Sequence, residues 1–371
     1  MATKEKETML QWLRGKSKVD CDTLDVEVAK SLGPFVDCTS NQAIAYNELI
    51  KPVHADLIKE SVALSREIVR AGTYPGVGVK ELGGEIAMLK LQHAIYPHLT
   101  GYIHIQTNPN HAYDTEKTIL NAKRTPSSPF LPSPFPLLSS PSPHNTPITT
   151  QLTRPGLISL SQKLSPTVDT SRICIKIPST WAGIQACRVL EKEGISTLAT
   201  TLFVMEQVLL AGEVGCRYIA PYVNELRVHF EEGFIDKRKH KASLLCLAAQ
   251  NYYASTNNTR TQVLPASLTH IDEVLALAGV HHITISPALL LELSQTGVEE
   301  NKVASLFSGN AHVEGFETGE GRGGVYGVSK EGEERWEREF KEADGGEGGR
   351  KLGDAIRIFC EMQGKLEELM G

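Results

Sequence analysis

The chain has 371 residues, of which 41% are hydrophobic and 22% charged, so it can bury a substantial core and is neither largely disordered nor collagen-like. Its 38 lysines and arginines against 44 aspartates and glutamates give a formal net charge of -6. This charge argues against a general nucleic-acid binder, which needs a basic face. The sequence contains no run of about 18 apolar residues, so no membrane span is predicted.

Short apolar segments alternate with helical patterns along most of the chain. We predict eight strands, at residues 18–23, 34–39, 102–107, 173–178, 197–203, 217–222, 261–267 and 282–286. Helical periodicity lies between many of them, as at residues 47–70, 113–124, 181–193, 204–214 and 271–278. Most of the strands are brief and β-branched, which is typical of strands covered on both faces.

This alternation predicts an α/β fold that consists of a single (β/α)₈ TIM barrel. An open doubly wound sheet is the alternative. A dinucleotide-binding sheet of that kind would have a Gly-x-Gly-x-x-Gly motif after its first strand, and this chain has none there. We therefore treat residues 1–371 as one barrel domain.

Two segments depart from the alternation. Residues 125–156 contain nine prolines and six serines but no aspartate, glutamate or lysine, a composition that cannot form a helix and offers no core. We interpret them as a disordered insertion or as a retained intron translated in frame. Residues 314–349 are rich in glycine and glutamate and predict a mobile loop. Residues 351–370 then predict a closing amphipathic helix, whose apolar face comprises Leu352, Ile356, Phe359, Met362 and Leu366.

Polar residues stand at the carboxyl ends of the predicted strands, where barrel enzymes carry their catalytic groups. Read in chain order, they are Asp22, Asn41, Gln106, Lys176, Thr200, Tyr222, Ser267 and Ser286. A barrel without catalytic function would also end its strands in polar residues, because these ends meet solvent. The pattern alone therefore favours neither interpretation.

Lys176 is the most informative of these residues. In the fourth strand the isoleucines of residues 173–177 alternate toward the helices, which leaves Cys174 and Lys176 facing the barrel interior. Burial disfavours an ammonium ion, and a neutral amine is the form that attacks a carbonyl to give a Schiff base. The alternative is a structural lysine that reaches solvent or pairs with Asp22.

The segment around this lysine, residues 176–184 (KIPSTWAGI), resembles the Schiff-base lysine segment of transaldolases. Further segments in the same order are similar to that family, at residues 22–23 (DT), 37–41 (DCTSN), 113–116 (YDTE), 220–223 (APYV) and 275–290. The resemblance extends to the C-terminal helix, with residues 125–156 as its one large interruption. It implies a class I aldolase-type (β/α)₈ barrel, in agreement with the strand count.

The resemblance also implies roles for individual residues. Lys176 would form a Schiff base with a ketose donor, and Asp22 would accept the proton of the hydroxyl whose loss splits the carbon–carbon bond. Thr200 would position a catalytic water. Substrate binding is assigned to four further residues of the matching segments, Asn41, Ser267, Thr39 and Ser179. No metal ion or organic cofactor is expected.

Two positions resemble the fructose-6-phosphate aldolase branch of the family instead. Gln106 stands where transaldolases have a water-binding glutamate, and Tyr222 where they have a phenylalanine. A tyrosine there could donate or relay the proton that a glutamate-bound water handles elsewhere, so both residues are catalytic candidates. The alternative is that both exchanges are neutral.

The two positions at which transaldolases carry phosphate-binding arginines hold Glu225 and Thr269 in this chain. Arginine binds phosphate through parallel hydrogen bonds, whereas glutamate repels a phosphate and threonine offers one weak donor. Arg217, Arg227 or the basic residues 237–239 are alternative phosphate ligands, although a solvated charge run is the simpler interpretation of residues 237–239.

The sequence thus predicts a transaldolase, a transferase that moves a dihydroxyacetone unit from sedoheptulose 7-phosphate or fructose 6-phosphate to an aldose phosphate in the pentose phosphate pathway. One alternative is an aldolase that releases free dihydroxyacetone or uses an unphosphorylated acceptor. Another is a catalytically inactive barrel with a binding role. The expected partners are small sugars rather than nucleic acids or membranes, and a homodimer is one assembly that the sequence leaves open.

The cysteines and the N-terminus indicate the cytoplasm. Seven cysteines are scattered along the chain without a Cys-x-x-Cys pair, which argues against a zinc ribbon or redox dithiol and favours a reducing compartment. The first seven residues lack the apolar stretch of a signal peptide.

Overall fold

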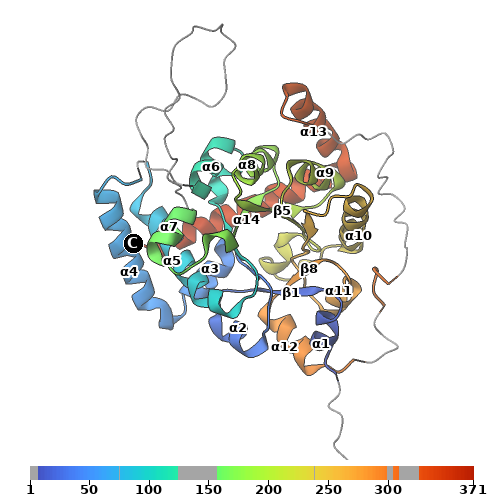
Figure 1. The fold of residues 1–371 in the computed structure, drawn as a ribbon, viewed down its shortest axis with the longest axis horizontal. Coiled ribbons are helices and arrows are strands. Elements are labelled where there is room, and N and C mark those ends of the chain that lie inside the picture. The colour runs from blue at the N-terminus through green and yellow to red at the C-terminus, as the bar shows by residue number, and fades with distance from the viewer. Residues whose placement is uncertain (1–6, 75, 124–156, 238, 299–303, 309–325) are drawn as a thin grey trace, which may run out of the picture.

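The fold was analysed in a computed structural model, which describes residues 7–74, 76–123, 157–237, 239–298, 304–308 and 326–371 (Figure 1). Eight parallel strands form one sheet in the order β7-β6-β5-β4-β3-β2-β1-β8. Their bounds are β1 Lys18–Asp22, β2 Cys38–Thr39, β3 Ile103–Gln106, β4 Ile173–Pro178, β5 Ser196–Leu202, β6 Tyr218–Pro221, β7 Gln262–Val263 and β8 His282–Ile285.

The two ends of this sheet approach each other. Beside the β7–β8 gap, the Thr284 amide donates to the Pro265 carbonyl at 3.3 Å, and the Val263 amide donates to His281 Nδ1 at 3.1 Å. The sheet is therefore a nearly closed barrel, and the predicted (β/α)₈ architecture is confirmed.

Helices surround the strands (Figure 1). Their bounds are α1 Met9–Arg14, α2 Val26–Leu32, α3 Gln42–Leu49, α4 Ala55–Arg70, α5 Val79–Ile95, α6 Thr115–Lys123, α7 Leu157–Leu164, α8 Trp181–Lys192, α9 Met205–Val214, α10 Lys239–Ser255, α11 Ile271–Ala276, α12 Pro287–Gln295, α13 Lys330–Glu342 and α14 Glu347–Leu369. The prediction of one helix over residues 47–70 is wrong: α3 ends at Leu49, and Pro52 begins the short 3₁₀ helix Pro52–His54 before α4. Proline lacks the amide proton that a continuing helix needs.

The alternation of side chains along β4 explains why Lys176 points inward. Ile173, Ile175 and Ile177 belong to the large apolar cluster between barrel and helices, whereas Cys174 belongs to a separate cluster inside the barrel. Because side chains of a strand alternate between faces, Lys176 shares the inner face with Cys174.

Part of the predicted Gly/Glu-rich loop is helical. Within residues 314–349 the structure describes α13 over Lys330–Glu342, so the loop prediction is wrong there, while residues 314–325 lie outside the described part. Ser329 caps this helix by accepting from the Gly332 amide, and Trp336 is buried and donates its indole N–H to the Glu206 carbonyl at 3.0 Å. Fixed caps and a buried aromatic offset the low apolar content of this segment. The proposed insertion at residues 125–156 also lies outside the described residues.

The C-terminal helix α14 lies across the carboxyl end of the barrel. It packs against α3 and against the short helices Pro109–His111 and Leu226–His229, which follow β3 and β6. Its Ala355, Ile358 and Phe359 belong to the interior cluster together with Tyr222. A buried ion pair between Lys351 Nζ and Asp236 Oδ2, at 2.8 Å, ties the start of α14 to the loop after β6. The helix therefore forms part of the roof over the site.

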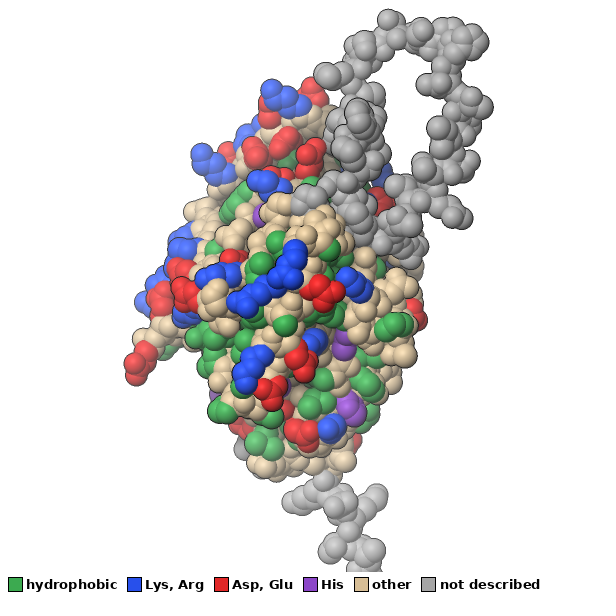
Figure 2. All heavy atoms as spheres, turned by 90° about the vertical axis from the view of Figure 1, so that its left-hand side faces the viewer, with side chains coloured by type: hydrophobic (Ala, Val, Ile, Leu, Met, Phe, Trp, Pro, Cys, Tyr) green, Lys and Arg blue, Asp and Glu red, His purple; other side chains and the backbone are tan. Residues whose placement is uncertain are grey.

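Among the described residues, no helix is both long and apolar enough to cross a bilayer. On the face shown in Figure 2, lysine and arginine side chains are interspersed with aspartate and glutamate side chains.

Candidate active site

A cavity of about 450 Å³ opens at the carboxyl end of the barrel. Four of the predicted site residues line it together: Asp22 at the end of β1, Asn41 after β2, Tyr222 after β6 and Ser267 after β7. Ser286, which follows β8, lines it as well. Residues that are far apart in sequence thus meet at one opening, as expected for the carboxyl ends of barrel strands.

Lys176 lies beneath this cavity rather than in its wall. Its side chain is almost wholly buried, at 2% exposure of the residue, and Nζ donates to the Ser40 carbonyl at 3.2 Å. Ser40 directly precedes Asn41, so the amine lies next to the cavity wall. Among the described residues no carboxylate is within ion-pair distance of Nζ, which argues against a structural pair with Asp22.

The neighbours of Lys176 leave hydrogen-bonding atoms available. Gln106 is opposite Lys176 in the β3–β4 register and is 2% exposed, and Thr200 on β5 is fully buried. Both amide atoms of Gln106 and the Thr200 hydroxyl have no hydrogen-bond partner among the described residues. Buried polar atoms are rarely left in that condition, so these groups can bond a molecule bound at Lys176.

Asp22 is held by a chain of hydroxyl groups. Thr39 Oγ1 donates to Asp22 Oδ1 at 2.6 Å, and Thr284 Oγ1 lies 2.6 Å from Thr39 Oγ1. A hydroxyl has one proton, so Thr284 must be the donor in the second bond. Thr39 is 1% exposed and outside the cavity lining; its contacts are those of a residue that orients Asp22.

Asn41 and Ser267 present polar groups from constrained backbones. Asn41 Oδ1 accepts from the Ile44 amide at 3.0 Å and caps α3, so its N–H₂ group is the part available to a ligand. Ser267 has φ of 60°, a strained value for a residue with a Cβ. Two donors of Asn224, the backbone amide at 3.2 Å and Nδ2 at 2.9 Å, hold the Ser267 carbonyl in this conformation.

Ser179 is not brought to the cavity. It is fully buried, and its hydroxyl donates to the Thr200 carbonyl, which fixes the turn from β4 into α8 against β5. Thr180 caps α8 through the Gly183 amide at 2.8 Å. A Cβ at Gly183 would lie 2.1 Å from the Pro178 carbonyl oxygen, so the turn after the lysine strand requires glycine there.

His229 lines the cavity and was not predicted from the sequence. It ends the short helix Leu226–His229 after β6, and its Nε2 is 2.9 Å from Ser267 Oγ. Burial lowers the pKa of His229, although the charges of Asp22 and Glu273 act in the opposite direction. The connection after β6 is long, and long loops at this end of a barrel carry function, which was the available signal.

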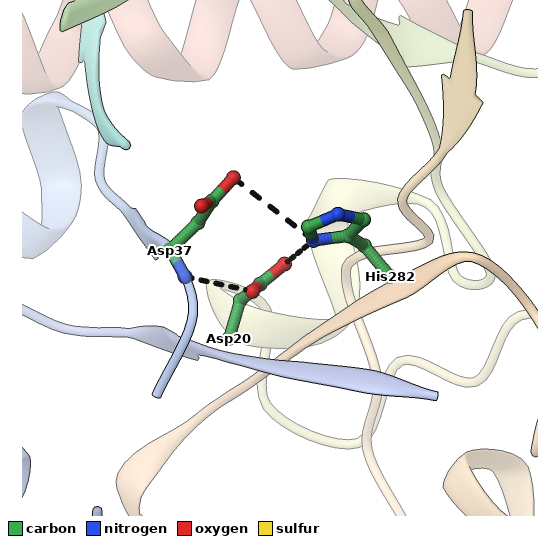
Figure 3. Close-up of side chains that lie close together, drawn as sticks. All are labelled: Asp20, Asp37 and His282. Carbon is green, nitrogen blue, oxygen red and sulfur yellow. Dashed lines mark hydrogen bonds and ion pairs between the residues drawn. The ribbon is translucent and has the colours of Figure 1, made fainter. Parts of the chain in front are cut away.

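A second ionisable cluster lies inside the barrel, one layer below the cavity: Asp20, Asp37, His104 and His282, each at most 1% exposed. His282 Nδ1 is 2.9 Å from Asp20 Oδ2, and His104 Nε2 is 3.0 Å from Asp37 Oδ2. Figure 3 shows Asp20 and Asp37 pointing toward His282. Burial raises the pKa of Asp20, although His282 acts against it; for Asp37 burial is outweighed by His104, and its pKa is lowered.

Asp20, Asp37 and His282 place their ligand atoms within 4.8 Å of one another, which is close enough to hold a metal ion. Each carboxylate, however, already bonds one histidine and one backbone amide. The Asp20 carboxylate accepts from the Asp37 amide at 2.9 Å, and the Asp37 carboxylate accepts from the Tyr102 amide at 2.7 Å. These bonds use both oxygens of each carboxylate, whereas His104 Nδ1 and His282 Nε2 have no hydrogen-bond partner among the described residues. The carboxylates are thus held as parts of a structural network.

Known proteins similar to this chain carry the name transaldolase. The sequence profile described as "Transaldolase/Fructose-6-phosphate aldolase" matches residues 150–320. A protein named transaldolase from Edwardsiella ictaluri is 29% identical over 372 residues, which cover 97% of either chain. The chain is thus similar to the transaldolase/fructose-6-phosphate aldolase family over most of its length. A Rhizobium etli transaldolase is 28% identical over 77% of this chain and 78% of its own length, and a transaldolase B from Pasteurella multocida is 28% identical over 77% and 79%.

The two positions where transaldolases carry phosphate-binding arginines are occupied differently. Glu225 is 4% exposed and accepts from Arg350 Nη1 at 2.9 Å and Nη2 at 3.3 Å. The Thr269 backbone amide donates to Glu273 Oε2 at 2.8 Å.

None of the proposed substitute cations whose side chains the structure describes lines the cavity. Arg227 pairs with Glu231 at 2.7 Å, and Arg217 stacks on Tyr102 at the amino end of β6. Lys237 is exposed and does not line it either, and the side chains of residues 238 and 239 lie outside the described set.

Proposed function

We propose that the chain is a transaldolase-type enzyme that transfers a dihydroxyacetone unit from a ketose to an aldehyde through a Schiff base on Lys176. The observation that carries this proposal is a buried lysine without an anionic partner, placed beside a cavity that Asp22, Asn41 and Ser267 line. The family implies sugar phosphates as substrates. Seven cysteines without a disulfide support a cytoplasmic location.

The proposed reaction uses two groups of the chain for its bond changes. The Lys176 amine adds to the ketone carbonyl and water leaves, which gives an iminium ion. Asp22 takes the proton of the C4 hydroxyl as the C3–C4 bond breaks; the electrons of that bond enter the iminium and form an enamine, and an aldehyde departs. The enamine then attacks the acceptor aldehyde, the new alkoxide takes its proton from Asp22, and hydrolysis restores the amine.

Other residues support these steps. Thr39 keeps one Asp22 oxygen in place through its 2.6 Å bond. Gln106 and Thr200 can hold the water that leaves as the Schiff base forms and later hydrolyses it. Their side-chain atoms are unpartnered, Gln106 is opposite Lys176 in the β3–β4 register, and Thr200 is on the neighbouring strand β5, opposite Pro178. Asn41 and Ser267 can bind substrate hydroxyls from the cavity wall.

Asp22→Asn separates Schiff-base formation from bond cleavage. The variant should lose about 10²- to 10⁴-fold in kcat, the usual contribution of a general base, yet still form a borohydride-reducible adduct with dihydroxyacetone. Initial rates with fructose 6-phosphate and mass spectrometry of the reduced protein measure the two properties. Asp56→Asn, on the exposed side of α4, is the matched control. Full activity of Asp22→Asn would remove the proposed base.

An aldolase that releases free dihydroxyacetone is the second candidate, and it is favoured by Tyr222, whose ring lies in the cavity wall 6.0 Å from that of Phe203. A phenol at this place can donate a proton to the enamine and so free the three-carbon product. Incubation with fructose 6-phosphate alone distinguishes the two. Free dihydroxyacetone without an acceptor supports the aldolase, and turnover that depends strictly on an acceptor excludes it.

A further inference from the structure

We infer, on the basis of the proposed function, that the outer part of the cavity receives the uncharged hydroxylated end of an aldehyde acceptor rather than a phosphate group. The charged side chains that line the cavity are three carboxylates, those of Asp22, Asp25 and Glu48, and one ammonium group, that of Lys51. A phosphate group carries about two negative charges near neutral pH. It would enter a cavity whose fixed charges repel it.

Lys51 is already neutralised by its neighbours. Its Nζ lies 2.8 Å from Asp25 Oδ2 and 2.8 Å from Glu48 Oε2. Burial acts in the opposite direction, but the hydrogen bonds to these carboxylates raise the pKa of Lys51, and the bond to Lys51 lowers that of Asp25. His54 lies on the far side of Glu48, with Nε2 2.8 Å from Glu48 Oε1. A phosphate would have to compete with two carboxylates for one cation.

The loop after β6 reinforces this charge pattern. Glu225 binds Arg350 in two parallel bonds, and the same guanidinium also contacts Glu347 and Asp354 at 2.8 and 2.9 Å. Arg350, which reaches this loop from α14, is therefore shared among three carboxylates. Burial also lowers the pKa of His229 in the same loop, against the opposing charges of Asp22 and Glu273.

The remaining wall suits hydroxyl groups and carbon. Asn41, Asn47, Ser267 and Ser286 supply neutral donors and acceptors, while Ile44 and Phe230 supply apolar surface. Neutral polar groups on an apolar wall are the usual means of binding a polyhydroxylated chain. The acceptor class is therefore an unphosphorylated hydroxyaldehyde such as glyceraldehyde.

The test compares D-glyceraldehyde with D-glyceraldehyde 3-phosphate as acceptors for the purified full-length protein. The rate of ketose formation from dihydroxyacetone is measured at pH 8, above the ordinary histidine range of about 6.5. We expect kcat/KM to be at least about tenfold higher for the unphosphorylated aldehyde, because a screened charge repulsion of about 1.4 kcal/mol corresponds to a factor of ten. A preference for the phosphorylated aldehyde, together with an intact Schiff base on Lys176, would overturn the inference and leave the proposed function standing. Failure to form the Schiff base would instead remove the proposed function.

A double variant tests the assignment to the Lys51 site. Asp25→Asn with Glu48→Gln keeps side-chain size and the Asp25 cap of α2, which accepts from the Glu27 amide at 3.0 Å, but it releases Lys51. The kcat/KM for D-glyceraldehyde 3-phosphate, divided by that for D-glyceraldehyde, should then rise about tenfold. The control variant Asp56→Asn should leave this ratio unchanged. An unchanged ratio in the double variant, with the fold intact by circular dichroism, would contradict the role of these carboxylates.

Discussion

Lys176→Met is expected to lower kcat by about 10⁴-fold or more, because it removes the atom that forms the covalent intermediate. The buried position of Lys176, its single hydrogen bond to the Ser40 carbonyl and the lack of an ion pair make methionine a good replacement for its aliphatic chain. The variant should therefore fold, and its thermal unfolding midpoint should be no lower than that of the parent protein. Loss of activity without loss of stability is the signature of a catalytic lysine.

Two measurements check this expectation. Steady-state rates with fructose 6-phosphate and a hydroxyaldehyde give the loss of activity, and thermal denaturation followed by circular dichroism gives the stability. Lys192→Met, on an exposed position of α8, is the control for the same substitution outside the site. A Lys176→Met protein that keeps more than a few per cent of the activity would rule out a Schiff base at this position.

His282→Leu is expected to lower the free energy of unfolding by about 3–5 kcal/mol, because it leaves the buried Asp20 carboxylate without its side-chain partner. His282 and Asp20 lie 2.9 Å apart inside the barrel and are 1% and 0% exposed. Without the imidazole, the Asp20 carboxylate retains only its bond to the Asp37 amide. The double variant Asp20→Asn with His282→Leu should recover roughly half of the loss, because no uncompensated charge remains.

The loss of unfolding free energy caused by His282→Leu should also depend on pH. Burial already raises the pKa of Asp20, and His282 is the group that acts against this shift, so removing His282 raises it further. A carboxyl whose pKa is higher in the folded than in the unfolded state favours folding as pH falls. The His282→Leu protein should therefore be less destabilised at pH 5 than at pH 8. Urea unfolding at both values measures this, and equal, additive effects of the two substitutions would contradict a coupled pair.

Much of the fold was predictable because strand patterns are local. The isoleucines of β4 alternate with Cys174 and Lys176, and their burial on opposite sides follows from the geometry of any strand. The β4 bounds agree with the prediction, whereas β2 and β7 are only two residues long, because ladder pairing also depends on neighbouring strands. The break at Pro52 was readable from the sequence; the helix Lys330–Glu342 was obscured by its low apolar content.

The site was predictable only where strand ends fix positions. Asp22, Asn41, Tyr222 and Ser267 meet at the cavity because they end parallel strands of one barrel. Their hydrogen-bond partners could not be predicted from the sequence, because these partners depend on side-chain directions and long-range packing. Thr39 bonds Asp22, and the Ser179 hydroxyl bonds the Thr200 carbonyl, although both residues belong to segments assigned to substrate binding.

The surroundings of the cavity were equally hidden. His229 reaches Ser267 across 38 positions of the chain, and Arg350 reaches Glu225 across 125. Such pairs leave no spacing pattern. Only their side-chain chemistry is visible in the sequence, and it does not specify a partner.

Borohydride reduction in the presence of dihydroxyacetone and, separately, fructose 6-phosphate, followed by peptide mass spectrometry, tests the central claim most directly. A three-carbon adduct on Lys176 that is absent from Lys176→Met is the expected result. No adduct from a folded protein, or an adduct on another lysine alone, would contradict the Schiff-base mechanism and favour a barrel that binds without catalysis.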